Sequence, residues 1–229
     1  TLDYGKFYIQ ETTEYMRQSL KVWAELGFSF DVVSTGMILS AEQAALVSDF
    51  CEQSAKKGAL VFVDPIMGDE GKLYNGVGEE TIAHMRKMVA VADCIVPNYT
   101  EAAYLADVPY HEDMTEEEAR ALTIRLHEMG AKSVVVTSAK VDGENCVVGY
   151  DGTEGEFFRI PFDLIPVRFV GTGDIFAAVM LGRLVDGVPL QESTHRAMDA
   201  VRTMIDRNRD KEDKYLGIPI ETCLEVLDE

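Results

Sequence analysis

A glycine-rich tetrapeptide in the last third of the sequence carries the residues best suited to catalysis. Gly171, Thr172, Gly173 and Asp174 precede a run of apolar residues at helical spacing. The glycines allow a tight turn, so the backbone amides can converge just before the predicted helix. Such a helix start attracts anions, because its N–H groups are unpaired and its dipole is positive there. The tetrapeptide therefore predicts an anion hole for a phosphoryl group, with Asp174 as the general base that deprotonates an attacking hydroxyl.

The same four residues also fit a structural role. Aspartate is a favoured residue at helix N-termini, and glycine is common before a helix. A motif of four residues does not by itself distinguish catalysis from helix capping. The catalytic interpretation gains weight only if other polar residues gather at the same place.

Polar residues also follow several predicted strands. Asp64 comes directly after the apolar run at residues 59–63, and Asn98 follows the strand predicted at residues 94–96. The carboxyl ends of parallel strands share one edge of a sheet, which is where ligands bind. The polar residues expected at this edge are Asp64, Asp69, Asn98, Glu101, Thr137, Ser138 and Asp174.

Three of these residues are candidate magnesium ligands. Phosphoryl transfer uses Mg²⁺ held through carboxylates and water. Asp64, Asp69 and Glu101 can supply those carboxylates, directly or through water. Structural alternatives stand beside this, since Asp64 with Pro65 can end a strand and Glu101 can interact with a helix dipole.

Another group consists of candidate phosphate contacts. Hydroxyl and amide side chains at the sheet edge can bond phosphate oxygens, and lysines can pair with them, although a lysine is more often a solvated surface charge. These candidates are Asn98, Thr137, Ser138, Lys6, Lys72 and Lys140.

Strand and helix patterns alternate along the chain. Helices are predicted at residues 11–26, 40–57, 79–91, 101–106, 115–129, after Gly171, at 190–207 and near 220–227. Strands are predicted at residues 28–34, 59–63, 94–96 and 133–137, with a hairpin at 145–150 and 155–161 and a loop at 66–78. Thr100 is expected to cap the helix at 101–106. This order predicts one α/β domain over residues 1–229, with a mostly parallel sheet covered by helices on both faces.

Composition narrows the possible partners. The chain has 229 residues, with 21 Lys and Arg against 40 Asp and Glu, and its net charge of −19 argues against nucleic acid or an anionic membrane as a partner. The four cysteines form no C-x-x-C pair, and the four histidines form no metal-spaced cluster. No apolar run has the length of a transmembrane helix and no signal peptide is visible, so a cytoplasmic protein is expected. The sequence begins at Thr1 without a methionine.

Four segments together resemble those of pyridoxal kinases. Residues 64–69 (DPIMGD) with 71–74 (GKLY) are similar to the family's D-P-V-M-G-D…G-x-L-Y segment, and residues 97–102 (PNYTEA) to its P-N-x-x-E-A segment. Residues 135–138 (VVTS) and 171–174 (GTGD) are similar to a strand ending in Thr-Ser and to the G-T-G-D box. Thr1 to Lys6 is similar to the portion after the family's second strand. The four segments occur in the family's order along nearly the whole chain.

The resemblance implies a ribokinase-like fold and a reaction. The γ-phosphoryl of ATP would pass to the 5′-hydroxymethyl group of pyridoxal, pyridoxine or pyridoxamine, with Mg²⁺ as cofactor. Whether a monovalent cation is also required stays open. A homodimer is the expected assembly. It implies that Asp174 is the base, that the amides of residues 171–173 form the anion hole, and that a hairpin around Asp151 lies over or beside the nucleotide. It also implies that Asp69 and Glu101 belong to the Mg²⁺ and phosphate environment, with Asp64 close by. Asn98, Thr137 and Ser138 would then meet the nucleotide phosphates.

The sequence also departs from the family pattern. The family carries roughly forty more residues, about one βα unit, before the equivalent of Thr1. Met37 stands where many relatives have Tyr, and Val96 where some have Thr beside the phosphates. Two alternatives stay open: a hydroxymethylpyrimidine kinase of thiamin synthesis, which shares the fold and base, and a nucleotide-binding fragment without turnover.

Overall fold

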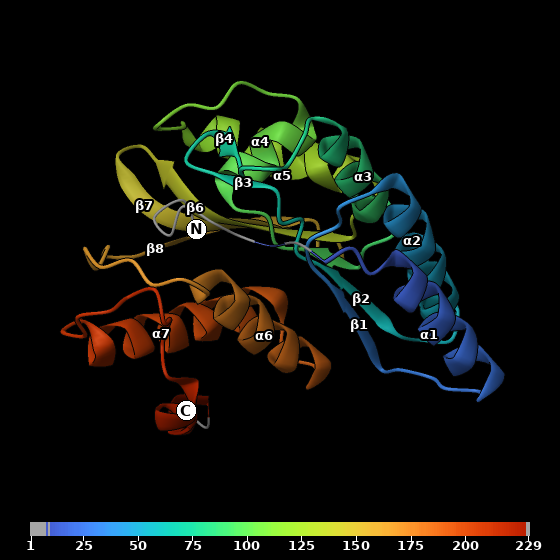
Figure 1. Cartoon of the computed structure of the whole chain (residues 1–229). Coiled ribbons are helices and arrows are strands. Elements are labelled where there is room, and N and C mark those ends of the chain that lie inside the picture. The colour runs from blue at the N-terminus through green and yellow to red at the C-terminus, as the bar shows by residue number, and fades with distance from the viewer. Residues whose placement is uncertain (1–7, 9, 228–229) are drawn as a thin grey trace.

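The centre of the molecule is a six-stranded sheet with the order β1-β2-β5-β6-β7-β8 (Figure 1). A computed structural model describes residue 8 and residues 10–227. The strands are β1 (Val32–Thr35), β2 (Leu60–Val63), β5 (Cys94–Ile95), β6 (Ser133–Val141), β7 (Glu144–Asp151) and β8 (Glu156–Pro161). The pairs from β1 to β6 are parallel, whereas β7 and β8 continue the sheet antiparallel.

Helices cover both faces of this sheet. They are α1 (Thr13–Glu25), α2 (Ala41–Ala55), α3 (Glu80–Val89), α4 (Tyr99–Ala106), α5 (Glu116–Glu128), α6 (Thr172–Val185) and α7 (Leu190–Asn208). Helices α2 to α5 contribute to the hydrophobic core on one face, and α6 and α7 to the core on the other (Figure 1). The predicted three-layer α/β/α architecture is therefore confirmed.

Alternation within the strands explains why both faces are buried. In β2, Val61 and Val63 point into the core beneath α2 to α5, whereas Phe62 packs into the core with α6 and α7. The same alternation separates Val134 and Val135 in β6. Since successive side chains of a strand point to opposite faces, a continuous apolar run suits a strand that is covered on both sides.

Two helix starts differ in how well the sequence predicted them. Ser40, where the helix predicted at residues 40–57 begins, caps α2, and its side chain accepts a hydrogen bond from the Gln43 amide. The prediction that Thr100 caps the next helix is wrong, because Asn98 is the N-cap of α4 and forms a reciprocal capping box with Glu101. Asparagine and threonine are both good caps, and here the choice depends on tertiary contacts of Asn98.

Two segments have more local structure than predicted. Residues 66–78 were predicted to be a loop, but they contain a small antiparallel hairpin of β3 (Gly68–Asp69) and β4 (Lys72–Leu73). Residues 220–227 form two short 3₁₀ helices, η2 (Ile220–Thr222) and η3 (Leu224–Leu227), in place of the predicted α-helix. Both elements are too short to produce a clear periodicity in the sequence.

The β7–β8 turn does not lie where the resemblance implied. Ser133, at the start of β6, pairs with Asp151, at the end of β7. Because β7 runs antiparallel to β6, the turn after Asp151 lies at the amino end of β6 and thus at the opposite edge of the sheet from Thr137. The hairpin turn at Asp151, which was expected over or beside the nucleotide, therefore lies at the opposite end of the sheet from the residues expected to meet the nucleotide phosphates. The turn between β6 and β7 lies at the carboxyl edge instead.

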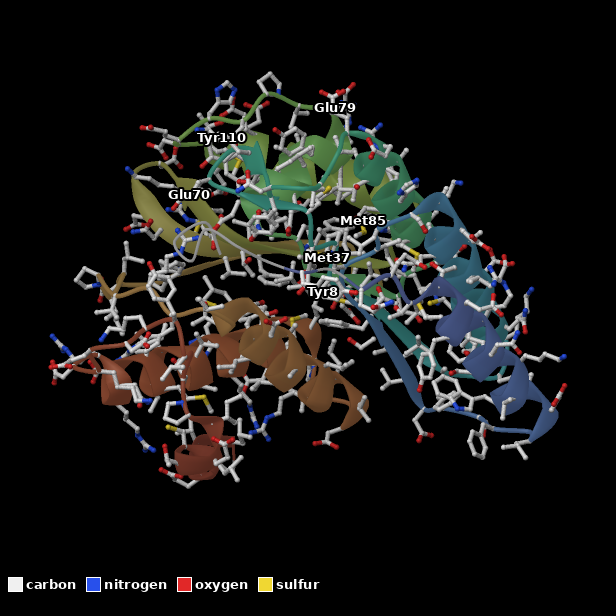
Figure 2. All side chains as sticks on the ribbon, viewed as in Figure 1. Tyr8, Met37, Glu70, Glu79, Met85 and Tyr110 are labelled. Carbon is white, nitrogen blue, oxygen red and sulfur yellow. The ribbon has the colours of Figure 1, made fainter. Side chains whose placement is uncertain are left out.

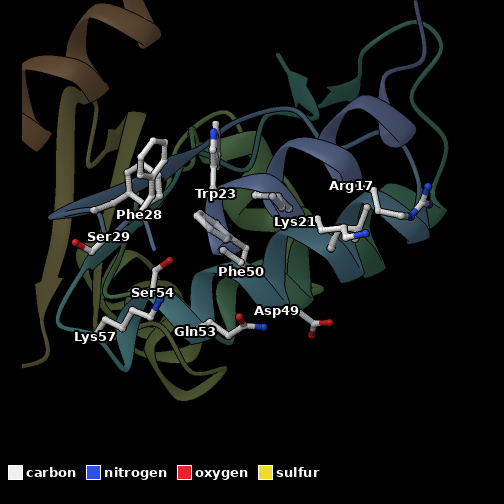
Figure 3. Close-up of a pocket in the computed structure, with 14 residues that line it drawn as sticks. Arg17, Lys21, Trp23, Phe28, Ser29, Asp49, Phe50, Gln53, Ser54 and Lys57 are labelled. Carbon is white, nitrogen blue, oxygen red and sulfur yellow. The ribbon is translucent and has the colours of Figure 1, made fainter. Parts of the chain in front are cut away.

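A cavity of about 270 Å³ lies between α1, α2 and residues 28–30 (Figure 3). Trp23, Phe30 and Phe50 pack beside one another there, with ring centroids 5.4 to 6.2 Å apart. None of the residues predicted to act in catalysis lines this cavity. Among the described residues, no helix is both long enough and apolar enough to cross a membrane.

Candidate active site

The carboxyl edge of the parallel strands gathers polar residues from separate parts of the chain. Asp64 follows β2 directly, and its amide donates to the carbonyl of Thr35 at the end of β1 (3.1 Å). Asn98, beyond β5, forms a parallel bridge with Thr137 in β6. The expected alignment of Asp64, Asn98 and Thr137 along one edge is confirmed. At the same edge, the buried hydroxyl of Thr35 has no hydrogen-bond partner among the described residues.

The start of α6 has the geometry of an anion site. Gly171 is the N-cap and has a φ of 84°, a left-handed conformation that favours glycine. The first bond within the helix runs from the Ile175 amide to the Gly171 carbonyl (3.1 Å), so the amides of Thr172, Gly173 and Asp174 have no acceptor within the helix. A Cβ built on Gly173 would meet no atom within 4 Å, so the space beside this turn is open.

Asp174 does not cap this helix. The cap position belongs to Gly171, and Asp174 is the third residue of α6. Its side chain is exposed, and one carboxylate oxygen lies 3.7 Å from where a Cβ on Gly171 would stand. The structural alternative of Asp174 as an N-cap is thus excluded, and its carboxylate faces the glycine turn.

Acidic groups from three segments lie close enough to influence one another. Burial, together with the charge of Asp174, raises the pKa of Asp64 to about 7. Burial also raises the pKa of Glu101 to about 8, to which Asp64 contributes, although three backbone amides oppose the shift. Asp64 is thus close enough to both Asp174 and Glu101 for their charges to interact.

Tyr74 lies within the same group. Its pKa is raised to about 12, first by burial and then by the charges of Asp69 and Glu101, while Arg168 acts in the opposite direction. The ring follows β4, so the hairpin brings Tyr74 and Asp69 to the buried acids. Part of this group was missed in the sequence: Tyr74 belongs to the G-x-L-Y segment but received no role, and Arg168 received none either.

Glu101 and Asn98 fix the hairpin to α4. One carboxylate oxygen of Glu101 accepts from the amides of Met67 (3.0 Å) and Gly68 (3.4 Å), and the other from the amide of Asn98 (2.9 Å). The Asn98 side chain accepts from the Glu101 amide (3.0 Å) and donates to the Gly68 carbonyl (2.7 Å). Only 3% of Glu101 is exposed. These contacts give both side chains a structural task; direct contact of Glu101 with metal and of Asn98 with phosphate stays a prediction.

The remaining candidates differ in their surroundings. The amide of Thr137 donates to the Pro97 carbonyl (2.9 Å), which joins the extension of β5 to β6. Ser138 is exposed at a bulge, with a φ of 55°, and the strand that was expected to end there continues to Val141. Lys72 and Lys140 are exposed, and Lys6 lies outside the described residues.

The predicted metal ligands do not form a ready-made cage. In the described part of the chain, no three His, Cys, Asp or Glu side chains lie close enough together to hold a metal ion by themselves. Asp69 pairs with Arg168, and both oxygens of Glu101 accept backbone hydrogen bonds. Asp64 makes no side-chain hydrogen bond or ion pair with any described residue. This arrangement fits Mg²⁺ held by one or two carboxylates, water and phosphate oxygens.

The three-layer α/β/α architecture, with a helix that begins at a glycine turn beside the acidic edge of the sheet, is the ribokinase-like fold. A family model described as phosphomethylpyrimidine kinase matches residues 9–217. The chain belongs to this family.

Some proteins similar to this chain are named phosphomethylpyrimidine kinase, and others are named pyridoxal kinase. A crystal structure of a provisionally named phosphomethylpyrimidine kinase from Bacteroides thetaiotaomicron VPI-5482 is 32% identical, with a TM-score of 0.94, and the match covers 100% of this chain and 80% of that one. Pyridoxal kinase from Lactobacillus plantarum is 26% identical, with a TM-score of 0.85 over 98% of this chain and 81% of that one. Pyridoxal kinase of Arabidopsis thaliana is 32% identical over 171 residues, which are 71% of this chain and 53% of that protein. The chain therefore spans about half the length of the curated relatives it matches.

Proposed function

We propose that this chain is an ATP-dependent kinase that phosphorylates the 5′-hydroxymethyl group of pyridoxal, pyridoxine or pyridoxamine. The observation that carries the proposal is the start of α6, where the Asp174 carboxylate faces the Gly171 turn beside the unpaired amides of Thr172 and Gly173. Phosphoryl transfer needs a base for the attacking hydroxyl and donors for the phosphate oxygens, and these two needs are met side by side.

Each residue has a defined task in this mechanism. Asp174 accepts the proton of the attacking hydroxyl, and the amides of Thr172 and Gly173 stabilise negative charge on the transferred phosphoryl group. Asp64 would hold Mg²⁺, with Asp69 and Glu101 as further candidates directly or through water, and the bound ion would neutralise charge on the phosphate oxygens. Glu101 and Asn98 position the β3–β4 hairpin beside these groups. Thr137, Ser138, Lys140 and Asn98 are proposed to contact the nucleotide phosphates, and Glu101 is proposed to belong to the surrounding Mg²⁺ and phosphate environment.

The choice of substrate is supported by relatives. The proteins from Arabidopsis thaliana and Sus scrofa, 32% and 34% identical, are named pyridoxal kinases. The Bacteroides thetaiotaomicron protein, 32% identical, has a crystal form that contains pyridoxal. Met37, which is 47% exposed and follows β1, is proposed to lie near the pyridine ring (Figure 2). A homodimer is the proposed assembly.

A second candidate is phosphorylation of hydroxymethylpyrimidine, because the matching family is named for kinases of a related pyrimidine, phosphomethylpyrimidine. The two alcohols can be compared directly by measuring transfer of ³²P from γ-labelled ATP to each, at equal concentrations. We expect kcat/KM to be at least about tenfold higher for a B6 vitamer. A substrate that leaves a buried polar group of the pocket without a partner loses at least this factor in kcat/KM. A preference for the pyrimidine would select the second candidate, and nucleotide binding without transfer to either alcohol would indicate a non-catalytic nucleotide-binding chain.

A further inference from the structure

Arg168 joins two segments that carry site residues. It lies on the loop just before Gly171, and its guanidinium group donates to Asp69 (2.8 Å) and Glu70 (2.6 Å) on the β3–β4 hairpin. Glu70 is labelled in Figure 2, on the hairpin of the layer that contains α3 to α5. In the sequence, Arg168 is 98 residues from Glu70 and 99 residues from Asp69. No other described arginine or lysine makes an ion pair with Asp69 or Glu70.

Contacts other than these ion pairs also hold the hairpin in place. Its other side is already attached to α4, since Glu101 accepts from Gly68, Thr100 accepts from the Gly71 amide (2.9 Å), and the Tyr104 hydroxyl donates to the Gly71 carbonyl (3.3 Å). Arg168 is 71% exposed and Glu70 is 77% exposed. Ion pairs in such exposed positions are weak and exchange easily with other partners.

The charge balance of the site gives Arg168 a better partner. Four acids act electrostatically on one another or on Tyr74 at the proposed site, and the whole chain carries a net charge of −19; these acids are Asp64, Asp69, Glu101 and Asp174. A polyphosphate therefore approaches against an unfavourable field. Arg168 is the cation that acts on Tyr74 within this group. Its planar fork of N–H donors matches two phosphate oxygens, which a lysine ammonium does not.

We propose that Arg168 is a phosphate-binding residue of this site. Asp69 and Glu70 hold its guanidinium group when no nucleotide is bound, and they release it to the phosphates when a nucleotide binds. The inference rests on the proposed function, because it takes the nucleotide to lie at the start of α6. Transfer of the guanidinium from Asp69 to phosphate leaves the Asp69 carboxylate free for other ligands. Glu70 is then a competitor of the nucleotide for the same cation.

The test measures binding of AMP-PNP with Mg²⁺ by isothermal titration calorimetry at fixed ionic strength. Arg168→Gln should raise the Kd by about tenfold, because charge-assisted hydrogen bonds are lost. The Kd of Arg168→Lys should lie between those of wild type and Arg168→Gln. Glu70→Gln should lower the Kd by about two- to threefold, because it removes the competitor. Arg196→Gln is the matched control, since Arg196 pairs with Glu192 on the surface of α7 (2.8 Å), and it should leave the Kd unchanged.

A double-mutant cycle separates competition from a general charge effect. In the Arg168→Gln background, Glu70→Gln should no longer tighten binding. Equal tightening in both backgrounds would show that Glu70 acts only through its charge, and the competition would be disproved. If wild-type chain phosphorylates a vitamer but Arg168→Gln binds AMP-PNP as tightly as wild type, the inference alone fails. If wild-type chain binds no AMP-PNP, the inference and the proposed function both fail.

Discussion

Replacing Asp174 by asparagine should abolish most of the catalytic rate while leaving the structure in place. The asparagine side chain has the same size but cannot accept the proton of the substrate hydroxyl. General-base catalysis contributes about 10² to 10⁴ in rate, or about 3 to 5 kcal/mol of transition-state stabilisation. We therefore expect kcat to fall by at least about 10².

The effect on stability should be much smaller. Asp174 is exposed in the first turn of α6, where a carboxylate stabilises a helix by about 0.3 to 1 kcal/mol. Its loss is partly offset, because the variant removes the repulsion that Asp174 exerts on Asp64. For a chain of this size the change in Tm should stay within about 4 °C.

The assay compares three proteins. Rates of ADP formation with pyridoxal, affinity for AMP-PNP and Tm are measured for wild type, Asp174→Asn and Asp186→Asn. Asp186 is the C-cap of the same helix, so its variant controls for charge removal at the other end. Asp174→Asn should keep its nucleotide affinity within about threefold while it loses kcat. A kcat within about fivefold of wild type would refute the role of Asp174 as the base.

Three further variants test the surroundings of the base. Because the pKa of Asp64 is raised to about 7, the folded chain keeps a proton that the unfolded chain releases near pH 4, so this group contributes stability at low pH that is lost as the pH rises through about 7. Asp64→Asn should flatten that part of the plot of unfolding free energy against pH, measured with urea; an unchanged slope would contradict the burial of this carboxyl group. Glu101→Gln should cost about 1 to 3 kcal/mol in the same experiment, because a buried amide NH₂ cannot accept from the backbone amides, whereas Glu118→Gln in the exposed capping box of α5 should cost much less; equal costs would argue against the buried network. Gly173→Ala should stabilise α6 by about 0.5 to 1 kcal/mol and still lower kcat/KM for ATP, because the methyl group occupies the open space beside the turn; unimpaired kinetics would show that phosphate does not approach there.

The shared edge of the sheet was predictable because strand direction follows from a simple pattern. Apolar runs followed by Asp64 and Asn98 indicated buried parallel strands, and parallel strands must place their ends together. The tight glycine turn before α6 was also predictable, and in the structure Gly171 makes it with a left-handed conformation. These features depend on residues close in sequence and on one rule of topology.

Contacts between distant segments could not be predicted in the same way. Nothing near Arg168 in the sequence indicates Asp69 and Glu70, because the ion pairs form only when the hairpin and the loop before Gly171 meet in space. The cap of α4 depends likewise on Gly68, which accepts a hydrogen bond from Asn98. The turn at Asp151 lies at an unexpected end of the sheet for another reason. Because β7 runs antiparallel to β6, the turn after β7 lies at the amino end of β6.

The most direct test of the account locates the nucleotide on the chain. Amide chemical shifts of ¹⁵N-labelled protein are recorded while AMP-PNP and Mg²⁺ are added. If the nucleotide binds at the start of α6, the largest shifts should belong to Gly171, Thr172 and Gly173, with further changes at Asp64. Unchanged amides at these positions, with shifts confined to residues such as Trp23 and Phe50 around the cavity beside α1, would contradict it.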